Sequence, residues 1–291
     1  MQAFANAAAL LPPELRGAFL SMPEAVRARG EELRLRTGFA PSVRLAEGEQ
    51  PLPFRPVTEH DLQCVLTCAT GGSVHTAADS IRNGFVTARG GVRVGVCGVA
   101  AVQSGTVCGI RRLTSVCIRV PRAVPGCAGP VLPALLEGGF ADTLILSPPG
   151  AGKTTLLREI VRGLSERGLR VALADERGEV AGVCNGAPQF DVGPRTDVLT
   201  GAPKGEGAML LLRAMSPQVL AMDEITAEAD LAAASAAANC GVRLLATAHA
   251  GGLEELCSRR ACRTMLEAGL FQRAVIISVR EGRRCYAVLA L

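Results

Sequence analysis

Apolar and polar positions change their spacing about midway along the chain. In the second half, short apolar runs alternate with longer stretches in which apolar side chains recur every three or four positions. The short runs predict buried strands, and the longer stretches predict amphipathic helices. We expect strands at residues 143–146, 171–174, 219–222, 244–247 and 274–278. Strands that alternate with helices imply an α/β fold with a mostly parallel sheet covered on both faces.

The first half of the chain carries shorter, strand-like signals. Residues 92–97 alternate apolar and other side chains, and the Gly-Gly pair at 90–91 allows a tight turn back onto residues 84–88. Thr58 followed by Asp61 is a capping signal, so a helix is expected to begin there. Further strands are expected at residues 33–36, 42–45 and 116–120. This half is therefore predicted to be a smaller α+β domain.

Proline and glycine are concentrated between the two halves, as expected for a junction between domains. We therefore predict an N-terminal α+β domain over residues 1–125, a linker region at 126–140 and an α/β domain over 141–291. A chain of 291 residues is long enough for two domains of this size.

The strand at 143–146 runs into the sequence SPPGAGKTT and then into a helical pattern. This order is the context of a phosphate-binding loop (P-loop), in which backbone N–H groups and the positive end of the helix dipole meet phosphate oxygens. Lys153 is expected to reach the β- and γ-phosphates, and the Thr154 hydroxyl to hold Mg²⁺. Ser147 replaces the first glycine of the pattern G-x-x-x-x-G-K-[ST], which makes the loop entry unusual. The other positions expected to bind nucleotide are Pro148, Pro149, Gly150, Ala151, Gly152 and Thr155. A glycine-rich turn without a ligand is the alternative.

The apolar strand at 219–222 ends in two carboxylates, Asp223 and Glu224. We expect this strand to lie next to the P-loop, where Asp223 supplies a hard oxygen ligand to Mg²⁺. Glu224 is then placed to polarise the attacking water as a general base. The pattern is common by itself, and its place downstream of a P-loop is what favours the functional interpretation.

Two further strand ends carry polar side chains. The strand predicted at 244–247 ends near Thr247 and His249, which are candidates to contact the γ-phosphate or the water, with a structural role as the alternative. Asp175 and Glu176 follow another strand, and ligands of parallel sheets bind at this end of the strands, so we expect both to contact the nucleotide. A solvated loop is the alternative for this pair. The guanine-reading sequence Asn-Lys-x-Asp does not occur, which makes ATP the expected nucleotide.

Composition restricts the class of protein. A hydrophobic content of 48% and a charged content of 20% fit a soluble globular protein. The eleven cysteines form no C-x-x-C pair, which favours reduced thiols in a cytoplasmic protein over a zinc site. The net charge of +4 is too small to indicate a nucleic-acid partner. No run approaches the ~20 apolar residues of a membrane span, and no leader is visible, so we expect the protein not to cross a membrane.

Blocks of sequence throughout the chain resemble one known family. In the second half these blocks are SPPGAGKTTLLREIVR, ADERGEVAG, DVGPRTDVLTGAPKGEG, LLLRAMSPQVLAMDEI and LLATAHA. In the first half they are EELRLRTG, IRNGFVTARGGVRVGVCG and IRRLTSVCIRVPR. Together they cover most of residues 31–280 and resemble the stage III sporulation protein AA family of the type II/IV secretion-system ATPase superfamily.

The resemblance implies a RecA-like ATPase domain that binds ATP and Mg²⁺, assembled as a ring-shaped homo-oligomer, with a hexamer expected. It implies work at the cytoplasmic face of the septal or forespore membrane, docked to membrane-embedded components of a sporulation channel. Arginines of the N-terminal domain are expected to neutralise the γ-phosphate. Arg119 is the best candidate, with Arg122 in the same motif and Arg112 close by; a solvated strand is the alternative.

Two other function classes compete with a secretion motor. A nucleic-acid-dependent ATPase would need a basic groove, and the mild charge and scarce aromatics weigh against it, so no nucleic acid is expected as a partner. A protein that binds nucleotide without hydrolysing it has no need of a base beside Asp223, and Glu224 therefore favours an enzyme.

Overall fold

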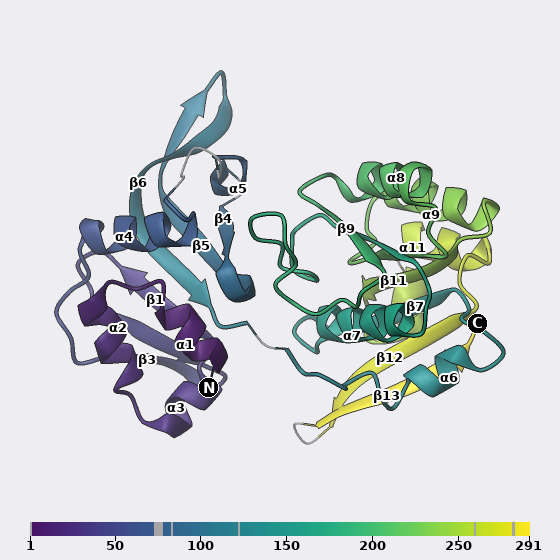
Figure 1. The fold of residues 1–291 in the computed structure, drawn as a ribbon, viewed down its shortest axis with the longest axis horizontal. Helices are drawn as coiled ribbons and strands as arrows, with labels where there is room; N and C mark the ends of the chain where they lie inside the picture. The colour runs from purple at the N-terminus through teal and green to yellow at the C-terminus, as the bar shows by residue number, and fades with distance from the viewer. Residues whose placement is uncertain (1, 73–77, 83, 122, 259, 281–282) are drawn as a thin grey trace. The chain divides into compact units, whose positions relative to one another are not determined.

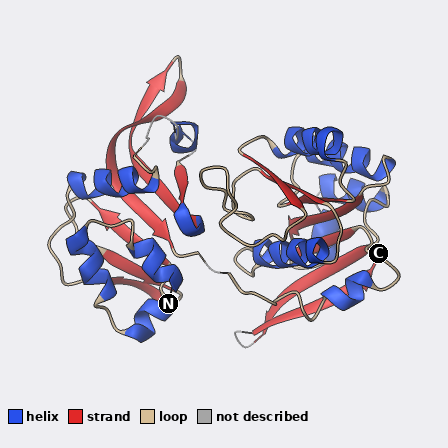
Figure 2. Ribbon diagram, in the orientation of Figure 1, coloured by secondary structure: helices blue, strands red, loops and turns tan. Residues whose placement is uncertain are grey.

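The computed structural model describes residues 2–72, 78–82, 84–121, 123–258, 260–280 and 283–291. Contacts divide the chain into two compact units. Unit 1 comprises Met1–Arg122 and Gly182–Gln189, and unit 2 comprises Ala123–Ala181 and Phe190–Leu291. Figures 1 and 2 show the helices and strands of both units.

Unit 1 is built on a six-stranded sheet in the order β3-β2-β1-β6-β5-β4, in which every pair is antiparallel. Its strands are β1 (Glu32–Arg36), β2 (Ser42–Leu45), β3 (Gly48–Pro51), β4 (Phe85–Ala88), β5 (Val92–Gln103) and β6 (Thr106–Arg119). Its helices are α1 (Gln2–Ala8), α2 (Pro13–Leu20), α3 (Glu24–Arg29), α4 (Glu59–Ala69) and α5 (Ala78–Arg82), and η1 (Arg89–Gly91) is a 3-10 turn.

The predicted helix start at Thr58 is confirmed. The Thr58 hydroxyl accepts the backbone N–H of Asp61 at 3.2 Å, and the Asp61 carboxylate accepts the backbone N–H of Thr58 at 2.8 Å. This reciprocal cap satisfies donors that α4 leaves open at its first turn. The Arg55 guanidinium donates to Asp61 at 2.7 Å and lowers the pKa of that carboxyl.

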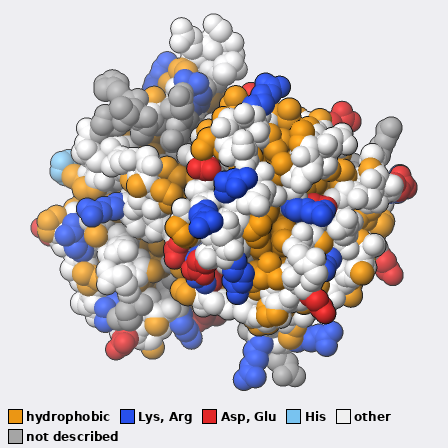
Figure 3. Space-filling model, turned by 45° about the vertical axis from the view of Figure 1, so that its right-hand side comes forward, with side chains coloured by type: hydrophobic (Ala, Val, Ile, Leu, Met, Phe, Trp, Pro, Cys, Tyr) orange, Lys and Arg blue, Asp and Glu red, His pale blue; other side chains and the backbone are white. Residues whose placement is uncertain are grey.

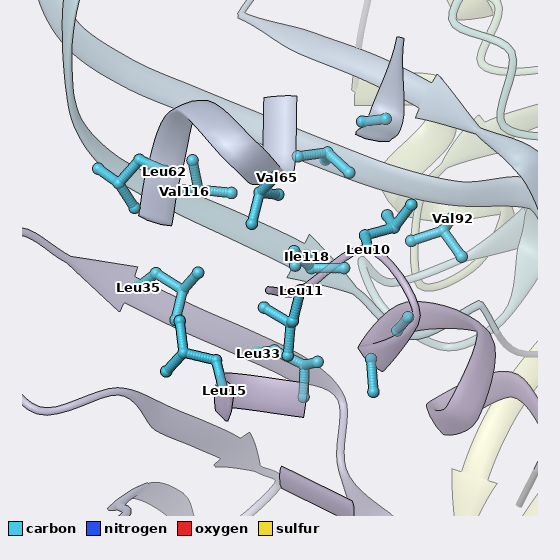
Figure 4. Close-up of a cluster of buried hydrophobic side chains, with 14 of the residues drawn as sticks. Leu10, Leu11, Leu15, Leu33, Leu35, Leu62, Val65, Val92, Val116 and Ile118 are labelled. Atoms are coloured by element: carbon cyan, nitrogen blue, oxygen red, sulfur yellow. The ribbon is translucent and has the colours of Figure 1, made fainter. Parts of the chain in front are cut away.

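The core of unit 1 lies between one face of the sheet and helices α1, α2 and α4 (Figure 4). Leu33 and Leu35 are fully buried because they alternate with outward-facing residues of β1. The strand predicted at 116–120 is the end of the much longer β6. The first ten residues of β6 were not predicted as a strand, because most of their side chains are exposed and the apolar alternation is therefore weak.

Unit 2 contains a seven-stranded sheet in the order β13-β12-β7-β11-β10-β8-β9. All neighbours are parallel except the hairpin of β12 and β13. The strands are β7 (Thr143–Ser147), β8 (Val171–Asp175), β9 (Thr196–Thr200), β10 (Val219–Met222), β11 (Arg243–His249), β12 (Arg273–Arg280) and β13 (Arg283–Ala290). The helices are α6 (Leu132–Leu136), α7 (Lys153–Glu166), α8 (Lys204–Met215), α9 (Glu228–Asn239), α10 (Leu253–Ser258) and α11 (Arg260–Glu267).

The direction in which the chain crosses the sheet sets where the helices lie. From β7 the chain moves outward to β8 and on to the edge strand β9, and from β9 it returns through β10 and β11 to β12. Right-handed crossovers then put α7 on one face of the sheet and the later helices on the other. In agreement, alternate residues of the central strands, such as Leu144 and Leu146, pack in one cluster with residues of α8 and α9. The predicted α/β fold with a mostly parallel sheet is confirmed.

The order of the strands in this sheet was not predicted. The strand that ends at Asp223 does not pair with the P-loop strand, because β11 lies between β10 and β7. Local sequence patterns do not specify strand order, which depends on how the crossovers pack. The edge strands β9 and β13 were not predicted, because neither shows the continuous apolar run of a buried strand.

Within the described part of the chain, no helix combines the length and apolar character that a membrane span needs. The cysteines that the structure describes are free thiols.

Candidate functional site

The predicted P-loop connects β7 to α7, and its backbone path depends on two glycines. Gly150 has φ 76° and Gly152 has φ 105°, both in the left-handed region that other residues rarely adopt. A Cβ atom on Gly152 would also lie 2.9 Å from Nε of Arg284. Ser147 is fully buried, and its hydroxyl donates to the carbonyl of Pro148 at 2.8 Å. The side chain of Ser147 is therefore used within the loop entry and is not presented to a ligand.

Three side chains join the P-loop to the strands beside it. The Thr154 hydroxyl donates to one carboxylate oxygen of Asp223 at 2.9 Å, and the Thr247 hydroxyl donates to the other at 2.7 Å. The Thr247 oxygen also accepts the backbone N–H of Glu224 at 2.8 Å. Thr247, on the inserted strand β11, thus fixes both carboxylate-bearing residues. The two groups predicted to hold Mg²⁺, Thr154 and Asp223, are in direct contact.

A second cluster surrounds the carboxylate of Glu224. His249 Nε2 lies 2.7 Å from Glu224 Oε1, and an ionised carboxylate only accepts, so Nε2 donates this bond. Lys153 Nζ lies 3.0 Å from Nδ1 and 3.2 Å from Nε2 of the same ring. An in-plane approach to both nitrogens would drive the ammonium into the carbon between them, so Nζ lies over the ring face. Lys153 Nζ is 3.8 Å from Glu224 Oε1, and Arg177 Nη1 is 3.4 Å from Oε2.

Burial and charge act in opposite directions on the pKa values of this cluster. Burial lowers the pKa of Lys153, and the carboxylates of Glu224 and Asp223 only partly offset it. Burial also acts to raise the pKa of Glu224. The hydrogen bond from His249 and the nearby charges outweigh that effect, so the pKa of Glu224 is lowered. Glu224 is therefore ionised at neutral pH and accepts hydrogen bonds.

The backbone of Glu224 is held in an unfavourable conformation. Its φ of 54° lies in the left-handed region, at a cost of roughly 1–3 kcal/mol for a residue other than glycine. The buried ammonium of Lys204 donates to the Glu224 carbonyl at 2.5 Å and lies 3.5 Å from the carboxylate of Asp230. Thr247 holds the N–H of the same residue. Lys204 was not predicted as a site residue, although it is one of only two lysines in the chain.

Asp175 and Glu176 are placed differently from each other. Asp175 is 2% exposed, and its carboxylate accepts the backbone N–H groups of Glu179 at 2.9 Å, Val180 at 3.2 Å and Ala181 at 2.8 Å. Burial raises the pKa of Asp175, and these hydrogen bonds act against the increase. Its contacts therefore assign Asp175 to holding the following loop. The Glu176 side chain is 44% exposed and lies 3.9 Å from Lys204 Nζ.

A cavity of about 280 Å³ opens beside the two strand-end carboxylates. Its wall includes Asp223, Glu224, Glu176, Arg177 and Lys204. The groups predicted from separate strand ends are therefore neighbours in space. Their roles toward a nucleotide stay predictions.

The candidate arginines belong to unit 1. Arg119 is 59% exposed and lies 3.6 Å from Glu32, while Arg112 donates to Glu59 at 2.9 Å. Arg122 lies outside the described residues. Arg119 lines a cavity of about 310 Å³ on the sheet of unit 1, together with Arg34, Arg36 and Arg93. Four arginines lining one cavity were not predicted, because they come from three strands that only the folded sheet brings together.

Comparison with known proteins identifies the family of this chain. A family model described as "Sporulation stage III, protein AA" matches residues 10–286. The chain belongs to this family. Stage III sporulation protein AA of Bacillus subtilis (strain 168) is 35% identical over 281 residues, which span 94% of this chain and 91% of that protein. The family resemblance seen in the sequence motifs is confirmed.

Solved structures show the same fold as this member of the stage III AA family. The ATPase DotB of Legionella pneumophila superposes with a TM-score of 0.59 at 15% identity, covering 99% of this chain and 78% of that one. The pilus retraction motor PilT, solved with bound ADP, gives a TM-score of 0.61 at 16% identity, covering 92% of this chain and 81% of that one. At this identity the likeness establishes a secretion-ATPase-like fold.

Proposed function

We propose that this protein is a Mg²⁺-dependent ATP hydrolase that powers assembly or operation of a specialised secretion-like channel during endospore formation. The observation that supports it best is the convergence of five side chains from three separate elements. Lys153 and Thr154 begin α7, Asp223 and Glu224 follow β10, and His249 ends β11, with contacts of 2.7 to 3.8 Å among them. Side chains without a shared role would not be expected to form such a network.

The loop and its neighbours fit a nucleotide and its metal. The helix dipole of α7 and the buried ammonium of Lys153 both favour an anion at the loop. The hydroxyl of Thr154 and the carboxylate of Asp223 are the hard oxygen donors that Mg²⁺ prefers. When bound, Mg²⁺ would neutralise charge on the β- and γ-phosphates.

In this proposal Glu224 orients the attacking water and accepts its proton. One oxygen of Glu224 bonds to His249 and the other faces Arg177, so the carboxylate has a fixed direction. Its lowered pKa makes it a weak base, and we expect it to act mainly by positioning, taking the proton as the attack proceeds. Lys204 and Thr247 keep its strained backbone in place.

The setting of the activity is carried by family membership and resemblance. We propose a ring-shaped homo-oligomer, a hexamer, at the cytoplasmic face of the septal or forespore membrane. It would dock to membrane-embedded components of the sporulation channel. Arg119, with Arg122 in the same motif and Arg112 close by, is the candidate to neutralise the γ-phosphate, and Arg119 also lines the arginine-lined cavity. An arginine in this role raises turnover by roughly 10³- to 10⁵-fold in other nucleotide hydrolases.

ATP hydrolysis by purified wild type, Lys153→Ala and Glu224→Gln tests the enzymatic part. We expect Lys153→Ala to lose ATP binding, and Glu224→Gln to bind ATP but turn it over at least roughly 100-fold more slowly. Glu166→Gln is the matched control, because Glu166 ends α7 and pairs with Arg162. Unchanged hydrolysis in Glu224→Gln would remove this residue as the base.

Each assay is repeated with single-stranded DNA and RNA, and the size of the assembly is measured with and without ATP. A nucleic-acid-dependent ATPase would need a clustered basic surface, whereas basic and acidic side chains are interspersed on the face shown in Figure 3. Strong stimulation by polynucleotide would instead support a nucleic-acid-dependent ATPase.

A further inference from the structure

The P-loop has two chemically different sides. The groups suited to a terminal phosphate and its metal, including Asp223, Glu224 and His249, come from β10 and β11 on one side of β7. Strands β12 and β13 lie on the other side. The inference drawn from these two sides rests on the proposed function, in which the loop binds a nucleoside triphosphate. If the terminal phosphate faces β11, the nucleoside end of the same molecule extends toward β12 and β13.

Arg284 of β13 reaches the P-loop itself. Its Nε donates to the carbonyl of Ala151 at 2.7 Å, and it lies close enough to Gly152 that a Cβ there would come within 2.9 Å. A guanidinium has five N–H donors, and this bond uses one of them. The edge strand β13 therefore forms a wall of the loop on the side opposite the strand-end carboxylates.

Tyr286 lies on the same face of β13 as Arg284, because side chains two residues apart point the same way. It pairs with Ile277, while the preceding Ile276 pairs with Leu146 of β7. Tyr286 is thus level with the residue after Leu146, where the P-loop begins. Two strand spacings, roughly 10 Å, separate it from β7.

The surroundings of Tyr286 place it beside the first turn of α7. Burial raises the pKa of its phenol, with Cys127 and Arg284 acting on the same group. The Cys127 thiol in turn contacts the carbonyl of Thr155 at 3.9 Å. The ring is half-buried, so part of its surface is open to solvent. A partly open aromatic ring beside a P-loop is suited to stack on a planar base.

We propose that the face of β13 carrying Arg284 and Tyr286 is the subsite for the nucleoside of the bound triphosphate. The Tyr286 ring stacks on the base, and Arg284 secures the loop carbonyl and the α-phosphate end. Stacking accepts any base with a π-face, so the subsite does not choose strongly between adenine and guanine. None of the predicted nucleotide residues belongs to this strand.

The chain supplies its own reporter for the test. It has no tryptophan and Tyr286 is its one tyrosine, so tyrosine emission arises from this position alone. Wild-type protein is titrated with Mg-ATP, Mg-GTP and Mg-tripolyphosphate, which has the phosphate chain without a base. We expect both nucleotides to quench the emission, and tripolyphosphate to bind without quenching. Quenching by tripolyphosphate as strong as that by ATP would overturn the proposal.

Calorimetric titration of variants gives the second measurement. Tyr286→Ala should weaken ATP binding roughly 5- to 100-fold and leave tripolyphosphate binding unchanged, because only the stack is lost. Tyr286→Phe keeps the ring and should bind ATP as wild type does. Cys285→Ser, on the opposite face of β13, is the control. Unchanged ATP affinity in Tyr286→Ala would refute the subsite alone, whereas wild type that binds neither ligand would refute the proposed function.

Discussion

Replacing Asp175 with alanine distinguishes two roles for this carboxylate. As a nucleotide ligand, its loss should weaken ATP binding. As the acceptor for the loop that follows β8, its loss should destabilise unit 2. The carboxylate accepts three backbone N–H groups, from Glu179, Val180 and Ala181, and it is 2% exposed. Its contacts favour the second role.

The size of the effect follows from these contacts. A buried donor left without a partner costs about 1–3 kcal/mol, so three of them cost roughly 3–9 kcal/mol. The variant also removes a carboxylate that burial penalises, as the raised pKa of Asp175 indicates, which offsets part of this cost. We therefore expect Asp175→Ala to lower the free energy of unfolding by about 2–5 kcal/mol.

Denaturant unfolding of wild type and Asp175→Ala measures the loss. Hydrogen exchange at the amides of residues 179–181 then assigns it to the loop, because a chain with two units need not unfold in one transition. Glu176→Ala is the matched control, since its side chain is 44% exposed and surface changes usually stay within about 0.5 kcal/mol. An Asp175→Ala protein with wild-type stability and weak ATP binding would refute the loop role.

Three further outcomes are expected. Thr247→Val keeps the shape of the side chain but loses the hydroxyl shared by Asp223 and Glu224. ATP turnover should therefore fall roughly 10- to 100-fold while ATP affinity is retained, and turnover equal to that of wild type would contradict this. Lys204→Met removes the hydrogen bond to the Glu224 carbonyl and should lower ATP turnover by a similar factor in the same assay. Lys153→Met, at the loop, should instead act mainly by lowering the affinity for ATP. The pKa of Glu224 is lowered in the folded protein, so its stabilising contribution is complete above about pH 4.3 and is lost as pH falls through the lowered value. The difference in unfolding free energy between wild type and Glu224→Gln should therefore shrink as pH is lowered below about 4.3, and a difference that grows there would have the wrong sign.

Features with a local signature were predictable from the sequence. The glycine-rich loop between β7 and α7, the apolar strands of unit 2 and the cap at Thr58 each depend on residues within a few positions of one another. The family resemblance was also available, because its blocks are continuous stretches. Asp223 and Glu224 were placed at a strand end, and the structure puts them there, after β10.

The remaining features depend on contacts between distant parts of the chain. Insertion of β11 between β7 and β10 follows from how crossovers pack, and no residue of β10 encodes it. Lys204 reaches Glu224 from α8, and Arg284 reaches the P-loop from the far edge of the sheet. Asp175 was predicted as a ligand because strand ends carry sites, and the fold adds that the next residues turn back onto its carboxylate.

The insertion of β11 makes assembly of the site cooperative. One hydroxyl, that of Thr247, contacts Asp223 on the side of the predicted metal and the N–H of Glu224 on the side of the predicted water. Sliding β11 along β10 by a single residue would break both bonds together, since neighbouring side chains of a strand point to opposite faces. Partly assembled states, with one carboxylate in position and the other displaced, are therefore disfavoured. A register shift of β11 would therefore separate the predicted metal ligand and the predicted base from their shared hydroxyl in a single step.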